Sequence, residues 1–388
     1  MAQSNPAEVL AALRALHAGI AARGEEIEQT RRLPADIAES LIRTGVFKLT
    51  VPAAIGGVEG TVLDLMTAIE EMSQADGATG WCVMISGTSG LTAAYLAPDV
   101  ARKIHGAPDA VTGGIFAPRG KATKVDGGYR VSGTWQWASG SSHCDWMKGG
   151  CIVYQDGKPK MLRDGVPDVR TMYFPRDKIT LHDNWYSSGL GGSGSCDMTV
   201  SDLFVPEEHT LSMISGKFYA DGALYRFPLF GLLAIGCGVV ALGIARGAIE
   251  DIRELAGAKT PTLSRRTLAE RGQVQSDIAK AHALVASARA WLVEEIGKSW
   301  ELASRGDELS TERRAALRLV AVHAVDAAVK ATDICYTLGG GTSVYRTSPL
   351  QRRFRDVHVI TQHMMVAAPA YELAGRVLLG LPTDPSMV

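Results

Sequence analysis

The chain has 388 residues, of which 46% are hydrophobic, and its 40 Lys and Arg against 41 Asp and Glu leave a formal net charge of −1. This apolar fraction excludes a disordered chain and predicts two or three packed domains. Because neutralising phosphates requires an excess of basic residues, a near-neutral chain is not expected to bind nucleic acid.

Two general patterns favour a cytoplasmic protein. The opening Met1 to Pro6 lacks the charged and then apolar order of a secretory signal. The six cysteines are scattered without a CxxC pair, so neither a disulfide framework nor a zinc or other metal site is expected.

Residues 1–108 predict an N-terminal helical domain. Its first helix shows apolar residues at spacings of three and four, the stripe of an amphipathic helix: Leu10, Leu13, Leu16 and Ile20. The segment from Trp81 to Leu96 is uncharged and predicts a buried helix near the end of this domain.

Residues 109–213 predict a central β domain, because Gly, Thr, Val, aromatics and turn pairs become common there. The strand candidates are Thr123 to Thr134 (bent at a turn), Met147 to Tyr154, Val169 to Phe174 and Met198 to Val205. Short strands joined by local turns indicate an antiparallel sheet or small barrel. The absence of a GxGxxG motif between a strand and a helix argues against a Rossmann unit.

Residues 214–388 predict a C-terminal four-helix bundle. Its helices are expected at Leu224 to Leu255, Leu263 to Ser304, Thr311 to Leu338 and Pro349 to Leu379. The uncharged run from Phe227 to Ala245 approaches the length of a membrane span, but a proline and four glycines inside it favour a buried core helix.

An aromatic stretch from Trp135 to Trp146 is the first candidate for a ligand site. A bound heteroaromatic ring needs an aromatic neighbour and hydrogen-bonding groups at its edge, and this stretch offers Trp137 and Ser139. The alternative is a tryptophan cluster that fills the core of a sheet, which composition alone favours.

Three consecutive glycines, Gly339, Gly340 and Gly341, form the second candidate. Consecutive glycines let backbone N–H groups approach an anion, and the arginines that follow could pair with phosphate. A helix C-cap and turn would use at least one of the same glycines, so both interpretations stay open.

His363 is the third candidate. The near-neutral pKa of histidine suits acid–base chemistry beside a cofactor, although an ordinary core or surface histidine is the commoner case. The two methionines that follow it are expected to fill a pocket or the core.

The order of the three domains resembles the acyl-CoA dehydrogenase superfamily over nearly the whole chain. Trp137-Ala138-Ser139 is similar to its Trp-x-Thr/Ser element, and Arg355-Asp356 is similar to the Arg-Asp pair before its active-site turn. The resemblance implies an α+β fold, mostly α, with an N-terminal helical domain, a central antiparallel β domain and a C-terminal four-helix bundle. It also implies that Trp137 packs beside a flavin ring and that Ser139 bonds the N5 edge of that ring.

The same resemblance implies cofactor contacts between subunits. Leu338-Gly339-Gly340 is similar to a Leu-Gly-Gly element that touches the flavin of a neighbouring subunit, and Gly341 extends it. Arg265 and Arg266 resemble the segment that donates an arginine to a partner's flavin phosphates.

One departure from the superfamily concerns the catalytic base. In many dehydrogenases a glutamate eight residues beyond the aspartate takes the substrate's alpha proton, but here that position is Met364. No acidic residue occurs between Asp356 and Glu372, nor between Asp221 and Glu250, where other members place the base. Abstraction of an alpha proton therefore has no evident base.

The departures resemble another branch, the oxygenase components of two-component (group D) flavin-dependent monooxygenases. A histidine falls at the position of His363 in that branch, beside the reactive face of the flavin. The other matching segments are Ala117-Pro118-Arg119-Gly120, Gly128 to Trp135, Ser139-Gly140 and Gly189 to Ser195.

This resemblance implies an enzyme that hydroxylates a small aromatic substrate, phenolic or indolic, with molecular oxygen and reduced FAD or FMN. A separate NAD(P)H:flavin reductase would supply the flavin, and the superfamily's usual arrangement implies a homotetramer, a dimer of dimers. The composition of Phe227 to Ala245 already argues against a membrane partner. Ser139 and His363 are the expected catalytic residues, and Trp81, Ser89 and Met364 are expected to line the substrate pocket. The alternatives are an acyl-CoA dehydrogenase-type flavoprotein that oxidises an acyl thioester and a non-catalytic helical interaction protein on this scaffold.

Overall fold

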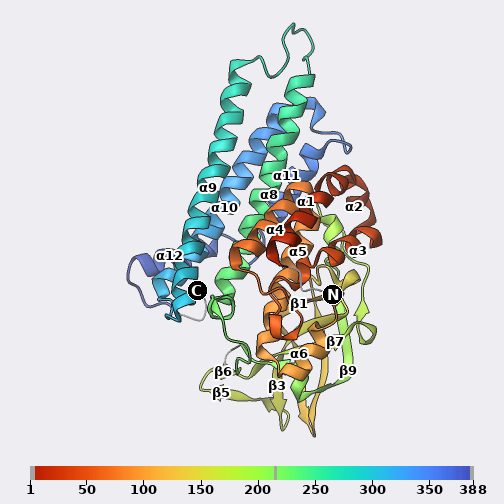
Figure 1. Cartoon of the computed structure of the whole chain (residues 1–388), viewed down its shortest axis with the longest axis vertical. Coiled ribbons are helices and arrows are strands. Elements are labelled where there is room, and N and C mark those ends of the chain that lie inside the picture. The colour runs from red at the N-terminus through yellow and green to blue at the C-terminus, as the bar shows by residue number, and fades with distance from the viewer. Residues whose placement is uncertain (1–4, 214–215, 385–388) are drawn as a thin grey trace.

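The computed structural model describes residues 5–213 and 216–384. Long helices form one end of the molecule, a β-sheet forms the other, and the N-terminal helices pack between them (Figure 1). The expected boundary between the second and third domains adjoins residues 214–215, which lie outside the described residues. Residues 1–4, part of the opening segment, lie outside them too.

The N-terminal domain is helical, as expected. Its α-helices are α1 Pro6–Ala22, α2 Gly24–Thr30, α3 Ala35–Thr44, α4 Val62–Ala75, α5 Gly77–Ser89 and α6 Pro98–His105. Asn5 and Glu8 form a capping box at the start of α1, and the Asp76 side chain caps α5. The uncharged segment from Trp81 forms α5 and the 3₁₀ turn after it, and nearly all of α5 is buried.

The central domain is a sheet in the order β10-β7-β3-β1-β2-β9-β8, with β4 paired to β3 and a separate β5–β6 pair. The strands are β1 Thr112–Val125, β2 Gly128–Trp135, β3 Trp146–Gln155, β4 Lys158–Pro159, β5 Met161–Arg163, β6 Val166–Pro167, β7 Val169–Pro175, β8 Thr180–Leu181, β9 Met198–Pro206 and β10 Thr210–Leu211. The prediction of a purely antiparallel sheet is wrong in one pair, because β1 and β3 run parallel. After β2 the chain does not turn back but crosses through residues 136–145 to the other side of β1, which makes the next strand parallel to it.

The C-terminal domain contains the expected bundle with shifted helix ends. Its helices are α7 Ala223–Arg226, α8 Leu229–Ala258, α9 Gly272–Arg305, α10 Thr311–Gly339, α11 Pro349–Ile360 and α12 Pro369–Leu378. Pro228 separates α7 from α8, and turns after Pro261 delay the start of α9. The last expected helix is two helices: α11 ends at Ile360, turns and bends occupy residues 361–368, and Pro369 stands in the first turn of α12, where its missing N–H costs no helical hydrogen bond.

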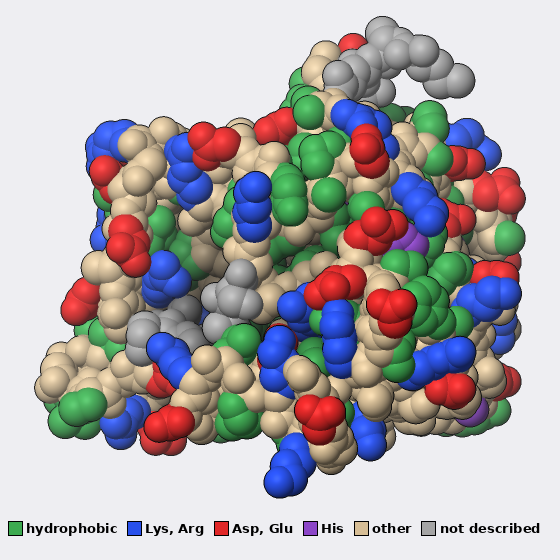
Figure 2. All heavy atoms as spheres, turned by 90° about the horizontal axis from the view of Figure 1, so that it is seen from below, with side chains coloured by type: hydrophobic (Ala, Val, Ile, Leu, Met, Phe, Trp, Pro, Cys, Tyr) green, Lys and Arg blue, Asp and Glu red, His purple; other side chains and the backbone are tan. Residues whose placement is uncertain are grey.

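Helix α8 is the buried core helix expected for Phe227 to Ala245. It is long and apolar enough to cross a membrane, yet 78% of its most apolar window is buried inside the molecule. It packs on α4, α5 and α10, so one apolar core joins the domains. Figure 2 shows the face at the sheet end, where basic and acidic side chains are interspersed.

Candidate active site

The aromatic stretch at the end of β2 contains one tryptophan that fills the core and one that is free to contact a ligand, so both interpretations of the stretch apply. Trp135 ends the strand in the core, fully buried, and its Nε1–H donates to the Gly150 carbonyl over 2.8 Å. Trp137 has a left-handed backbone, with φ at 66°, and its side chain is 62% exposed. Trp135 is therefore a core residue, whereas Trp137 offers a bare aromatic surface beside Ser139.

Ser139 lies in a row of buried hydrogen-bonding groups. The Nε1–H of Trp81 on α5 donates to Ser139 Oγ over 3.0 Å. Ser139 Oγ is 2.6 Å from Ser195 Oγ, which is 2.7 Å from Ser193 Oγ. The Ser193 hydroxyl donates to the Leu190 carbonyl over 2.7 Å. We call this row, Trp81–Ser139–Ser195–Ser193–Leu190, the serine relay.

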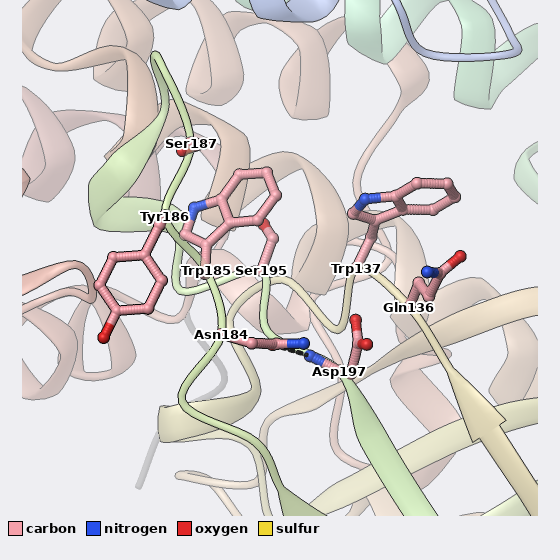
Figure 3. A pocket seen from close by; sticks show the side chains of 8 residues that line it. All are labelled: Gln136, Trp137, Asn184, Trp185, Tyr186, Ser187, Ser195 and Asp197. Atoms are coloured by element: carbon pink, nitrogen blue, oxygen red, sulfur yellow. Dashed lines mark hydrogen bonds between the residues drawn. The ribbon is translucent and has the colours of Figure 1, made fainter.

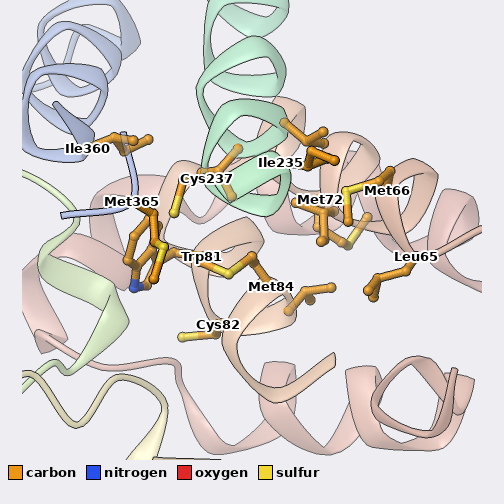
Figure 4. Close-up of a cluster of buried hydrophobic side chains, with 14 of the residues drawn as sticks. Leu65, Met66, Met72, Trp81, Cys82, Met84, Ile235, Cys237, Ile360 and Met365 are labelled. Atoms are coloured by element: carbon orange, nitrogen blue, oxygen red, sulfur yellow. The ribbon is translucent and has the colours of Figure 1, made fainter. Parts of the chain in front are cut away.

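His363 lies in the turn between α11 and α12 and reaches the same region through Trp81. The two rings meet edge to face with centroids 5.4 Å apart. The backbone N–H of Met365 donates to His363 Nδ1 over 3.4 Å, and Cys237 Sγ lies 3.5 Å from the same nitrogen. Trp81, Cys237 and Met365 belong to one buried cluster (Figure 4).

His363 is uncharged at neutral pH. Burial and, to a smaller extent, the positive charge of Arg318 lower its pKa to about 4. Burial also raises the pKa of the Cys237 thiol to about 12, so that thiol keeps its proton and donates. Because Nδ1 accepts hydrogen bonds, the network assigns the ring hydrogen to Nε2. The neutral ring is therefore a hydrogen-bond donor through Nε2.

A cavity of about 260 Å³ opens beside the relay. Its walls are Gln136, Trp137, Asn184, Trp185, Tyr186, Ser187, Ser195 and Asp197. Figure 3 shows the indoles of Trp137 and Trp185 rising from two separate segments of the chain. Ser195 belongs both to the cavity wall and to the relay, so the cavity reaches Ser139 through one hydroxyl group. Asp197 is the one acidic residue in this wall.

Asp356 of the Arg-Asp pair binds Leu190, the residue whose carbonyl ends the serine relay. Asp356 on α11 is buried and accepts a hydrogen bond from the Leu190 backbone N–H over 2.6 Å. Burial raises the pKa of Asp356 to about 7, and the negative charge of Asp76 adds to that rise. Leu190 has a left-handed backbone, with φ at 52°, so the contact fixes a strained turn.

Two residues predicted for the substrate pocket, Ser89 and Met364, do not line the cavity beside Trp137. The Ser89 hydroxyl accepts a hydrogen bond from the buried Lys148 ammonium and pairs with Thr112, because Ser89 is eight residues, about 12 Å, beyond Trp81 along α5. Met364 is 68% exposed, and its neighbour Met365 takes the place in the buried cluster because the turn directs the two side chains apart. The assignment of Ser89 and Met364 to a substrate pocket stays a prediction.

The predicted phosphate contacts lie at the far end of the bundle. Arg265 and Arg266 are exposed on the loop after α8, and Gly340 and Gly341 are exposed after α10. Lys259 ties the two segments together by donating to the Gly339 carbonyl and to Thr342. Cys237 and Lys259 are 22 residues apart along α8, which corresponds to about 33 Å. These residues do not join Ser139 within one chain.

Sequence reasoning missed several residues of this site. Trp185 and Tyr186 carry no motif, and only their aromatic character beside Asn184 could have drawn attention to them. Ser193 and Ser195 stand inside the glycine-rich segment used for the resemblance, but the pattern alone did not indicate that they meet Ser139. Outside this site, sequence reasoning also did not single out Lys148, a fully buried lysine whose pKa burial lowers to about 7.

The residues around Ser139 fit the ring system of a flavin. The exposed Trp137 indole offers a flat apolar face, the cavity beside it is lined by aromatic and polar side chains, and a buried hydroxyl stands at its edge. His363 adds a hydrogen-bond donor on the other side of Trp81.

Comparison with known proteins agrees with this geometry. Residues 9–99 match the family model of the acyl-CoA dehydrogenase N-terminal domain, and residues 235–368 match that of the C-terminal domain. An indole-3-acetate monooxygenase of Pseudomonas putida is 33% identical and covers 97% of this chain and 96% of its own. The FADH(2)-dependent resorcinol hydroxylase oxygenase component of Rhizobium is 27% identical and covers 92% of this chain and 90% of its own.

A solved structure extends the likeness to three dimensions. The HsaA monooxygenase of M. tuberculosis superimposes with a TM-score of 0.89 at 27% identity, over 99% of this chain and all of the other. The chain belongs to the acyl-CoA dehydrogenase family. Within that family it is a flavin-dependent monooxygenase, an oxidoreductase with a flavin cofactor, which favours oxygen chemistry over thioester oxidation or a purely structural role.

Proposed function

We propose that this chain is the oxygenase component of a two-component system that hydroxylates a small aromatic compound, phenolic or indolic. A separate NAD(P)H-dependent reductase supplies reduced FAD or FMN. Reduced flavin, when bound, supplies two electrons to molecular oxygen; one oxygen atom enters the product and the other leaves as water. Relatives named for indole-3-acetate and for resorcinol support an aromatic substrate.

One observation carries the proposal: the turn that follows Arg355-Asp356 presents a half-buried neutral histidine that is linked through Trp81 to Ser139. In the proposed site Trp137 forms a wall for the flavin ring and Ser139 bonds its N5 edge. His363 donates a hydrogen bond from Nε2 where oxygen reacts. The buried cluster around Trp81 excludes water, which would otherwise promote wasteful loss of hydrogen peroxide.

Anaerobic mixing with reduced FAD or FMN, followed by oxygen and an aromatic substrate, tests this function. We expect hydroxylated product from indole-3-acetate, resorcinol or a simple phenol, detected by chromatography. Incubation with acyl-CoA and an artificial electron acceptor is the counter-test, and Asp197→Asn is its matched variant because Asp197 is the acid in the cavity wall. Bleaching of bound flavin by the thioester without oxygen, lost in Asp197→Asn, would contradict the proposal.

We also propose a homotetramer, a dimer of dimers, in which each chain completes its neighbour's cofactor site. The separation between Ser139 and the segments of Arg265, Arg266 and Gly339 to Gly341 supports this arrangement, since one chain does not bring them together. Light scattering should give four chains per particle, and replacing both arginines with alanine should weaken flavin binding. A monomer that binds flavin with unchanged affinity in the double variant would contradict it.

The proposed location is the cytoplasm. All six cysteines are free, which suits a reducing compartment. Fractionation of the source cells should recover the protein with the cytoplasmic enzymes, and its recovery outside the cell would overturn this proposal.

A further inference from the structure

The bond from the Ser193 hydroxyl to the Leu190 carbonyl, which also accepts from the Trp185 indole N–H and the Ser193 backbone N–H, sets the direction of the serine relay. The indole N–H of Trp81 can only donate a hydrogen bond, and the carbonyl of Leu190 can only accept one. Each of the three hydroxyl groups between them has a single hydrogen. Because Ser193 donates to Leu190, Ser195 must donate to Ser193 and Ser139 must donate to Ser195.

This direction leaves Ser139 with no hydrogen to offer. Its hydrogen is directed to Ser195, and one of its two oxygen lone pairs accepts from Trp81. The remaining lone pair can only accept a hydrogen bond. Ser139, Ser193 and Ser195 are all buried, so water does not readily exchange into the row and reset it.

The two redox states of a flavin differ at the atom that Ser139 would meet. Reduced flavin has a hydrogen on N5, whereas oxidised flavin has a lone pair there. We propose that the serine relay makes Ser139 solely an acceptor and thereby selects reduced over oxidised flavin, with Ser195 and Ser193 as the positioning residues. This inference rests on the proposed location of the flavin N5 edge at Ser139.

The size of the selection follows from one hydrogen bond. To donate to an oxidised N5, Ser139 must give up its bond to Ser195, and the net loss of such a bond corresponds to roughly two- to tenfold in affinity. The ratio of the dissociation constants of oxidised and reduced flavin should therefore fall by that factor when Ser139 is released. A tenfold fall in this ratio equals a decrease of about 30 mV in the midpoint potential of the bound flavin.

Titration of the full chain with oxidised FAD in air and with reduced FAD under nitrogen measures this ratio. Ser195→Ala removes the acceptor of the Ser139 hydrogen and should tighten oxidised FAD relative to reduced FAD, while Ser195→Thr, which keeps the hydroxyl, should restore the ratio. Ser141→Ala is the matched control, because Ser141 is a buried serine whose hydroxyl contacts Cys196 instead of the relay. If Ser195→Ala does not fold, Ser193→Ala should act in the same direction, since Ser195 can then donate back to Ser139.

Ser139→Ala separates this inference from the function on which it rests. If Ser139→Ala weakens reduced FAD but neither Ser195→Ala nor Ser193→Ala changes the ratio, the relay has no role in selection and the proposed flavin position stands. If Ser139→Ala alters the affinity of neither form, the proposed flavin position is wrong and the inference fails with it.

Discussion

His363 presents two nitrogens of opposite character. Nδ1 accepts from the Met365 backbone and faces the Cys237 thiol, which leaves Nε2 as the donor. Since burial lowers the pKa of the ring to about 4, the side chain acts at pH 7 as a neutral donor rather than as a positive charge. A neutral donor can hold a reacting oxygen without adding a charge that would itself need solvation.

Replacing His363 with alanine should uncouple oxygen consumption from hydroxylation. Losing a donor to a developing negative charge costs roughly 1.5–3 kcal/mol, so product per reduced flavin should fall about ten- to hundredfold while hydrogen peroxide rises. Peroxide and product are measured together after mixing with oxygen. His358→Ala is the control, because His358 pairs with Asp333 on the outer side of α11. Wild-type coupling in His363→Ala would show that the assigned role is wrong.

At the residue scale, the sequence indicated residues that lie at a characteristic sequence distance from a predicted strand or from a family motif. Trp137, Ser139 and His363 were predicted in this way, and the structure links Ser139 and His363 through Trp81. The bonds of Ser139 to Trp81 and to Ser195 span 58 and 56 residues of chain, so no local pattern reports them. The exposure of Met364 and the use of Ser89 by Lys148 depend on how α5 and a turn are placed in space, which spacing alone does not determine.

At the element scale, the position of α8 is set by close helix contact. A Cβ atom at Gly243 would lie 2.5 Å from Ser73 Cβ and 2.7 Å from the Glu70 carbonyl oxygen, both on α4. The same helix contains Gly257, where an added Cβ would meet nothing within 4 Å. Substitution of Gly243 therefore tests the packing of α8 against α4, whereas substitution of Gly257 tests helix propensity alone.

Gly243→Ala should destabilise the protein, whereas Gly257→Ala should stabilise it. The first substitution forces α4 and α8 apart, and overpacking of this kind costs roughly 1–3 kcal/mol. The second only removes the backbone entropy of a helical glycine, which is worth up to about 1 kcal/mol. Urea unfolding followed by circular dichroism measures both. Equal shifts of the two midpoints would show that the contact between α4 and α8 does not limit packing.

Asp356 offers a second test at this scale, because it joins α11 to the turn that carries the relay. Asp356→Ala removes the acceptor of the Leu190 N–H and should cost about 1–3 kcal/mol. Asp356→Asn keeps an oxygen acceptor and removes a charge that burial disfavours, so it should be neutral or stabilising at pH 8. Thermal unfolding of the pair compares the two directly. If both variants lose the same stability, the charge rather than the hydrogen bond fixes the turn.

The elements themselves could largely be predicted from the sequence, and the exceptions have physical causes. Apolar periodicity located the helices of the first and third domains, while Pro228 and the turns of residues 361–368 divided helices that apolar content alone made continuous. The strands were located by composition and turns, but the parallel pairing of β1 with β3 is a topological choice. The sequence of residues 136–145 does not predict on which side of β1 the next strand will pair.

At the scale of the whole molecule, one buried histidine, His105, and two half-buried ones, His143 and His363, lie where the domains meet. His105 of α6 packs against Tyr173 of β7, His143 stacks on Phe47 of the N-terminal domain, and His363 packs against Trp81 of α5. Burial lowers the pKa of all three rings below the ordinary value. In the unfolded chain each would take a proton below about pH 6.5, and in the folded protein each resists it. Stability is therefore greatest above about pH 6.5 and is lost as the pH falls toward 4.

His143→Phe should reduce this acid sensitivity. Burial lowers the pKa of His143 to about 4, and within the described residues neither ring nitrogen has a hydrogen-bond partner. Phenylalanine keeps the stacking on Phe47 and binds no proton in either state. The difference in free energy of unfolding between the variant and the wild type should be about 2 kcal/mol more favourable to the variant at pH 5 than at pH 8.

Urea unfolding at the two pH values measures the difference, and His182→Phe, at an exposed histidine, is the control that should leave the pH dependence as it is. The remaining slope in His143→Phe should come from His105 and His363, because those rings stay neutral at the other two junctions. If His143→Phe loses stability equally at pH 5 and pH 8, packing rather than protonation governs this junction. The acid loss would then have to arise from other titrating groups, among them His105 and His363.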